Sequence, residues 1–267
     1  DAGRPAGEDP TARAARIVAL VALTDEAPTA AELAGYLDDP EPDVRRTAVS
    51  VLTESAPPDA AVALARRLLD DDGSVRQRAT DGLRELREVL TVDEHLRAAL
   101  VAASDPSAPA DVRPVAVRVR REHGLIATDE AEALAADPDV AVRREAAAAL
   151  VALDAVASLT ALVADAEALV RLDAAKGLGT LADPAGRDAL AALADDADVR
   201  VAAAATEALG RVGLDGPTEA RLRDALAAGA WEVRRAAATA LAGGDARSVD
   251  ALLRAAADDH ADVRRAA

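Results

Sequence analysis

One pattern of hydrophobic and polar positions recurs along the chain at steps of 28 to 37 residues. It begins at a Val, usually followed by Arg, and continues with Ala four residues and Leu eight residues after the Val. Ala is present in all eight copies, and Leu in six of the seven copies that reach its position. The first residues of the copies, termed the anchor valines, are Val44, Val75, Val112, Val142, Val170, Val201, Val233 and Val263. Spacings of four and eight place side chains on one helix face, so every copy predicts a helix with one apolar stripe.

A second, shorter helix is predicted before each of these helices, with an acidic turn between the two. Apolar residues at helical spacing occupy the ranges 60–69, 96–103, 156–164, 222–228 and 249–257. The turns that follow are rich in Asp, which can cap the next helix and favours its positive N-terminal end. One unit of helix A, turn and helix B cannot bury its own stripe, so stacked units must do so. The sequence therefore predicts an all-α fold: a right-handed α-α superhelix, or solenoid, of about eight helix-turn-helix repeats.

The Asp-rich turn followed by Val-Arg-x-x-x-Ala-x-x-x-Leu resembles the HEAT-repeat family, an armadillo-like group, and in particular its short-period PBS-lyase HEAT-like repeats. The resemblance covers roughly residues 30–267. It implies that helix B lines the concave face, and that turn Asp and helix B Arg side chains form a ladder between repeats. The ladder candidates are Asp43, Asp72, Asp111, Asp139 and Asp198 with Arg45, Arg76, Arg113, Arg143, Arg171, Arg234 and Arg264. Ala202 replaces the Arg in the sixth copy, and Arg200 lies just before its anchor.

The repeats predict a single solenoid domain over residues 1–267. Residues 1–28 are interpreted as a degenerate N-terminal unit, because Leu20 lies 32 residues before Leu52. Regular repeats fill residues 29–267, and the last one is incomplete at Ala267. The longest aliphatic run, at residues 17–23, is too short to span a bilayer. We therefore expect no membrane insertion and a cytoplasmic location.

Composition narrows the possible chemistry. The chain of 267 residues has no Cys, Met or Phe, so it has no thiol nucleophile or Cys-ligated metal site, and its core consists of Ala, Leu and Val. Its formal net charge of −17 argues against a nucleic-acid partner, which requires a basic face. Abundant Asp and Arg beside a single Lys are typical of a halophilic archaeon, whose acidic surfaces stay hydrated in concentrated salt, and the alternative source is a high-GC actinobacterium.

The sequence contains no specific catalytic motif. There is no Gly-rich phosphate loop and no G-x-S-x-G elbow. The resemblance includes di-iron deoxyhypusine hydroxylases, which need His-Glu pairs, whereas this chain has Glu94-His95 and Glu122-His123 in the reverse order. We therefore expect no catalytic residues, no metal, no cofactor and no enzymatic activity.

Two features suggest binding of a partner protein. The first is a basic cluster formed by Arg84, Arg87, Arg118, Arg120 and Arg121, with Arg120 at a position that other repeats give to Leu. Arginine forks suit an acidic segment or a phosphate, and the alternative is local pairing with nearby glutamates. The second is Trp231, which is either an exposed anchor or packs over the neighbouring repeat.

The function predicted from these observations is a non-enzymatic scaffold or adaptor that binds a partner protein along the concave helix B face. The alternative, suggested by the PBS-lyase-like repeat, is an accessory or lyase-type subunit that delivers a cofactor to a partner protein or modifies it.

Overall fold

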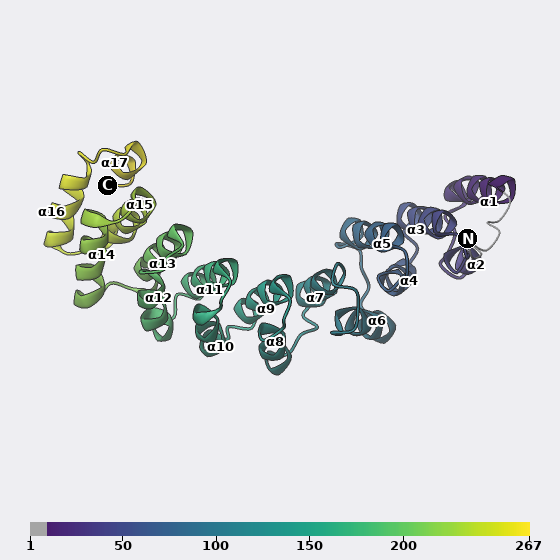
Figure 1. Cartoon of the computed structure of the whole chain (residues 1–267), viewed down its shortest axis with the longest axis horizontal. Coiled ribbons are helices and arrows are strands. Elements are labelled where there is room, and N and C mark those ends of the chain that lie inside the picture. The colour runs from purple at the N-terminus through teal and green to yellow at the C-terminus, as the bar shows by residue number, and fades with distance from the viewer. Residues whose placement is uncertain (1–9) are drawn as a thin grey trace, which may run out of the picture. The chain divides into compact units, whose positions relative to one another are not determined.

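The chain folds into short helices joined by tight turns (Figure 1). The structure, a computed structural model, describes residues 10–267 apart from the side chain of residue 228, and contains no strand in that range. These residues form two compact units, one up to Leu125 and one from Ile126 onward. The predicted all-α fold class of helix-turn-helix repeats is confirmed, whereas the grouping of residues 1–267 into one domain stays a prediction.

Helices A and B alternate in the first unit. Its elements are α1 (Pro10–Leu23), the 3-10 helix η1 (Thr24–Glu26), α2 (Ala34–Leu37), α3 (Pro42–Ser55), α4 (Ala60–Arg67), α5 (Gly73–Glu85), α6 (Glu94–Ser104) and α7 (Arg113–Glu122). Helices α3, α5 and α7 are the helices B of the first three repeats. Their partners α2, α4 and α6 are the helices A.

The second unit continues the same alternation. Its elements are α8 (Thr128–Ala135), α9 (Val140–Ala152), α10 (Val156–Ala161), η2 (Leu162–Ala164), α11 (Ala168–Leu181), η3 (Pro184–Gly186), α12 (Arg187–Leu193), α13 (Val199–Val212), α14 (Gly216–Ala228), α15 (Trp231–Ala240), η4 (Leu241–Gly243), α16 (Ala246–Ala255) and α17 (Ala261–Ala266). Helices α9, α11, α13, α15 and α17 are helices B, and they follow one another in one row (Figure 1).

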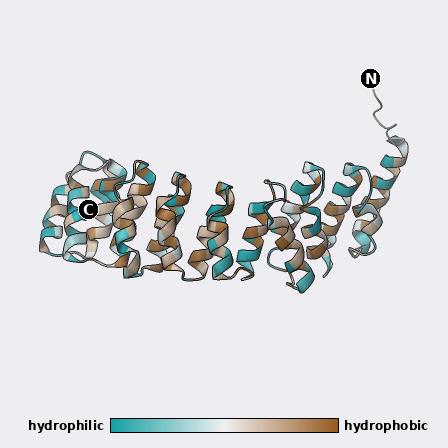
Figure 2. Cartoon of the chain, turned by 60° about the horizontal axis from the view of Figure 1, so that its bottom comes forward, coloured by the Kyte–Doolittle hydropathy of each residue, from teal (hydrophilic) through white to brown (hydrophobic). Residues whose placement is uncertain are grey.

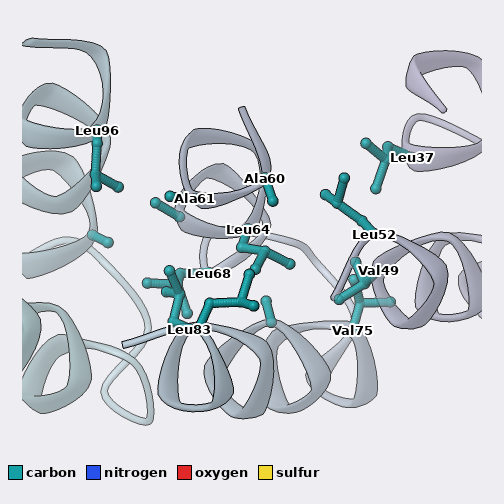
Figure 3. Close-up of a cluster of buried hydrophobic side chains, with 14 of the residues drawn as sticks. Leu37, Val49, Leu52, Ala60, Ala61, Leu64, Leu68, Val75, Leu83 and Leu96 are labelled. Carbon is teal, nitrogen blue, oxygen red and sulfur yellow. The ribbon is translucent and has the colours of Figure 1, made fainter. Parts of the chain in front are cut away.

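The residues of the repeat pattern form the cores. The eight anchor valines are at most 8% exposed, and seven of the alanines four residues later are fully buried. In the first unit, Leu52, Leu64 and Leu83 lie in one layer between α3, α4 and α5 (Figure 3). Hydrophobic residues alternate with hydrophilic ones along the helices, as Figure 2 shows, because only one stripe of each helix faces its neighbours. Each buried Leu contributes about 1.5–3 kcal/mol relative to exposure.

Consecutive helices B come into close contact at one recurring pair of positions, termed the B–B contact. One member lies nine residues after an anchor valine, and the other lies seven residues after the next anchor valine. At least one member is Gly or Ala in each close contact, and the pairs are Thr53 with Gly82, Val151 with Gly177, Gly179 with Ala208, and Gly210 with Ala240. A Cβ added to Gly82 would lie 2.5 Å from Thr53 Oγ1. Because Gly weakens a helix interior, these glycines are explained by the close approach of the helices.

Candidate partner-binding surface

The Arg that follows an anchor valine connects two repeats. Arg45 donates from Nη1 to the carbonyl oxygens of Asp39 (2.9 Å) and Pro40 (3.1 Å), in its own turn. Its Nε and Nη2 donate to the carboxylate of Asp70, in the next turn, at 2.9 and 2.7 Å. The side chains of Arg45 and Asp70 are only 8% and 2% exposed. Such an Arg–Asp pair, termed a rung, ties helix B of one repeat to the turn of the next.

The second unit repeats this geometry three times. The rungs and their Nε–Oδ2 distances are Arg143–Asp165 at 2.7 Å, Arg171–Asp196 at 2.6 Å and Arg234–Asp258 at 2.8 Å. Each Asp lies five residues before an anchor valine and accepts the backbone N–H two residues later at 2.8 Å. Each carboxylate is therefore oriented by a hydrogen bond within its own turn as well as by the Arg of the preceding repeat.

The rungs lower the pKa of their carboxylates. At Asp196 the hydrogen bonds from Arg171 are the main cause. At Asp70, burial acts to raise the pKa, but the hydrogen bonds from Arg45 and from the Asp72 N–H outweigh burial, and the pKa lies below its ordinary value. The other two rungs of the second unit shift the pKa in the same direction.

These pKa shifts predict a loss of stability in acid. Because the folded pKa lies below the ordinary value of about 3.9, the unfolded chain takes up more protons as the pH falls. The stabilisation is complete above about pH 5 and is lost as the pH falls through the folded pKa. Asp196→Asn should flatten the decline of the melting temperature between about pH 5 and about pH 2, measured by circular dichroism. The exposed Asp188→Asn, outside the ladder, is the control; equal slopes in both variants would contradict the prediction.

Three of the carboxylates predicted for the ladder cap helices instead. Asp72, Asp139 and Asp198 accept backbone N–H groups from the first turns of α5, α9 and α13 at 2.8 to 2.9 Å. They lie three residues before their anchor valines, two residues closer to the helix than the rung carboxylates. Their assignment to the ladder was wrong, because each turn holds two acidic positions and the nearer one is the N-cap.

The other two carboxylates predicted for the ladder, Asp43 and Asp111, each lie near an arginine of a preceding helix. Asp43 lies 3.1 Å from Arg46 on its own helix and 3.8 Å from Arg13 of α1, so an arginine of the preceding helix reaches it without the bidentate geometry of a rung. Asp111 does accept a hydrogen bond from Nε of Arg76 at 2.9 Å, although it directly precedes its anchor valine. Arg113 is buried, with 5% exposure.

The ladder is interrupted between the sixth and seventh repeats. Ala202 stands in place of the Arg, and the residue five before Val233 is Ala228, so the sequence lacks both members of the rung. Removing both members leaves no buried charge without its counter-ion. Arg200 instead pairs locally with Asp198 at 2.7 Å, and their hydrogen bond lowers the Asp198 pKa to about 2.

The helix before the first repeat belongs to the same ladder. Arg16 in α1 lies with its Nε 2.9 Å from Asp39 Oδ2 and donates from Nη2 to Oδ1 at 3.2 Å. Leu20, which lies 32 residues before Leu52, is fully buried in the core of the first unit, as the leucine spacing predicts, whereas Ala15, directly before Arg16, is exposed. Of the predicted N-terminal unit, residues 1–9 lie outside the described residues.

A hollow separates α5 from α7, where the close B–B contact is missing. The two contact positions hold Arg84 and Val119, neither of which is small. The resulting hollow has a volume of about 140 Å³. Its lining residues are Thr80, Leu83, Arg84, Arg87, Val115, Arg118, Val119 and Glu122. We refer to this hollow and its rim as the α5–α7 cleft.

The structure brings three of the five predicted arginines together at this cleft. Arg84, Arg87 and Arg118 line it and are exposed. Arg84 Nη1 lies 2.8 Å from Asp81, and Arg87 Nη2 lies 3.8 Å from Glu88. The cleft therefore combines an apolar floor with a mainly cationic rim.

Arg120 and Arg121 do not belong to the cleft. Arg120 is 3% exposed and donates to Ser104 Oγ at 2.9 Å, so its prediction as a surface binding residue was wrong. It replaces the Leu of the repeat pattern, and that position of helix B points into the core. Arg121 is half-buried and lies 3.6 Å from Glu122.

Comparison with known proteins identifies the repeat. The sequence profile of HEAT repeats matches residues 6–84 and 156–242. The chain belongs to the HEAT-repeat family. No curated protein matches it.

Solved structures support the HEAT-repeat fold. YibA from Escherichia coli is similar over 100% of this chain and 97% of its own, with 20% identity and a TM-score of 0.61. An engineered protein is similar over 97% of this chain and 84% of its own, with 20% identity and a TM-score of 0.57. The complex of CpcE and CpcF of phycocyanin lyase from Nostoc sp. PCC7120 is more distant, with 18% identity, 82% and 94% coverage, and a TM-score of 0.35.

Trp231 packs against the next HEAT repeat. Its ring stacks on that of His260 with centroids 3.9 Å apart and planes 14° apart, and it is 36% exposed. His260 also accepts the Asp262 N–H at 3.3 Å, so it caps α17. Trp231 therefore contributes to the junction between two HEAT repeats.

No helix in residues 10–267 has the length and apolar character needed to cross a membrane. Within the same range, no three or more His, Asp or Glu side chains are grouped to hold a metal ion.

Proposed function

We infer that the protein is a non-enzymatic scaffold that holds a partner protein along its helix B faces. The observation that carries this proposal is the pairing of successive helices B by two devices, the rungs and the B–B contacts. Both devices restrict how neighbouring helices can shift, so each unit presents a preformed surface. A preformed surface supports binding because less ordering is needed on association.

The outward positions of helix B support the same function. Six residues after the anchor valine, where no side chain is buried, the residue differs in each of the seven repeats that reach this position. These residues are Ser50, Asp81, Arg118, Ala148, Lys176, Glu207 and Thr239. The core residues are the same in most repeats, whereas the outward residues vary from repeat to repeat. Such a surface suits recognition of a partner whose own surface differs along its length. No feature of the described residues favours the lyase-type alternative.

Site-specific photo-cross-linking tests the proposal. A benzophenone amino acid is placed at Lys176 or Thr239 on helices B, and at Ala133 or Ala192 on helices A, all of which are exposed. In extracts of the source organism at its native salt concentration, both helix B positions should cross-link to the same protein. That protein, once purified, should reproduce the cross-links. Cross-linking that is equal at the helix A positions, or absent from the helix B positions, would contradict the scaffold function.

A further inference from the structure

The α5–α7 cleft differs from the other helix B junctions of its unit in shape. At the α3–α5 junction, Gly82 lets the helices meet directly. At the α5–α7 junction, the long Arg84 side chain and the branched Val119 occupy the equivalent positions, and a hollow remains. Its volume of about 140 Å³ lies below the roughly 300–1,000 Å³ of small-molecule pockets. The hollow therefore suits one inserted side chain better than a cofactor.

The floor of the cleft selects an apolar side chain. Leu83 and Val119 are 1% and 7% exposed, and Val115 is half-buried beside them. A polar group inserted there would lose its water and find few partners, at a cost of about 1–3 kcal/mol. An aliphatic side chain gains from the same burial.

The rim selects negative charge. Three arginines and one glutamate line the cleft in a chain whose formal net charge is −17. The pair of Arg84 with Asp81 is exposed, with side-chain exposures of 62% and 36%. Such surface pairs contribute only about 0–1 kcal/mol, so a carboxylate of a partner can compete for the guanidinium. Arginine forks bind carboxylates through two parallel hydrogen bonds.

We propose that the α5–α7 cleft binds an acidic segment of a partner protein, with an aliphatic side chain in the hollow and flanking carboxylates on Arg84, Arg87 and Arg118. This inference rests on the scaffold function and names the chemistry of the segment that the scaffold recognises. The remaining, mostly acidic surface repels such a segment, which gives the cleft selectivity along the chain.

Binding of a synthetic peptide tests the inference. The probe is a fluorescein-labelled peptide with one Leu between two blocks of three Glu, and binding to the full chain is followed by fluorescence anisotropy. The double variant Arg84→Glu/Arg118→Glu should weaken binding at least about tenfold. The matched control is Arg144→Glu/Arg211→Glu, which alters two exposed arginines on helices B of the second unit, each also paired with a carboxylate. Both double variants change the net charge equally, so the control should stay within about twofold of the original chain.

A second variant tests the hollow without changing charge. Val115→Phe should fill the space and weaken binding several-fold, while melting curves show that the chain stays folded. A peptide with Gln in place of Glu should bind poorly to the original chain. The inference is overturned if the original chain does not bind the Glu peptide, if both double variants weaken binding equally, or if Val115→Phe or the Gln peptide has no effect.

The two proposals fail in different ways. If cross-links place a partner on helices B but the cleft variants bind the peptide like the original chain, only the proposal that the α5–α7 cleft binds an acidic segment is rejected. If the peptide results are as expected but no helix B position cross-links to a protein, the scaffold function falls.

Discussion

Arg45→Ala is expected to lower the free energy of unfolding by about 3 kcal/mol, because it leaves a buried carboxylate without its main partner. Asp70 is 2% exposed on its side chain and receives two hydrogen bonds from Arg45. The loss lies at the low end of the range of about 3–5 kcal/mol for broken buried pairs. Arg67 accounts for this, since its Nη1 stays 3.5 Å from Asp70.

The neighbouring residue provides a matched control. Arg46 lies on the same helix, is 48% exposed, and pairs with an exposed carboxylate at 3.1 Å. Arg46→Ala should therefore cost no more than about 1 kcal/mol. Urea unfolding followed by circular dichroism measures both variants. Equal losses would show that the Arg45 rung contributes no more than a surface ion pair.

The sequence predicted the fold through features that depend on helix periodicity alone. Val44, Ala48 and Leu52 follow helical spacing, and the structure buries all three completely. The same register places the ladder arginines, because an Arg directly after an anchor valine reaches across to the next turn. These relations hold within one helix and its nearest neighbour, which is why they can be read from the sequence.

The carboxylates of the rungs were harder to assign, because both candidate positions are acidic in five of the eight turns. Asp70 and Asp72 are both plausible partners for an Arg on the basis of charge, and only the path of the turn shows which is buried. A signal was present in the sequence. The position five residues before the anchor is Asp in six of the eight repeats, and the sixth repeat loses its Arg at the junction where the seventh loses its Asp.

The candidate site was predictable in composition but not in shape. The arginines of the second and third repeats are visible as a cluster in the sequence. Arg120 stands at the Leu position of the repeat, which lies in the core, so it is buried while Arg118 is exposed. The hollow lies where a B–B contact would require small residues, and the two positions instead hold Arg84 and Val119. Recognising it requires knowing which positions of separate helices meet.

The B–B contact leads to the second large expected effect: Gly210→Val should destabilise the second unit by about 2–3 kcal/mol. A Cβ at Gly210 would lie 2.7 Å from both Cα and Cβ of Ala240, so the backbone of α15 itself blocks it. Overpacked sites of this kind cost about 1–3 kcal/mol, and a backbone neighbour cannot rotate away as a side chain can. The loss should exceed the few tenths of a kcal/mol by which Val improves on Gly in a helix.

Gly35→Val is the matched control for this contact. Gly35 lies in α2, and a Cβ there would have no heavy atom within 4 Å. The same substitution should therefore leave stability unchanged or raise it slightly through helix propensity. Thermal and urea unfolding of both variants separate the effect of close packing from the effect of propensity. If Gly210→Val were as stable as the original chain, α13 and α15 would not be in close contact, and the packing rule behind the α5–α7 cleft would lose its basis.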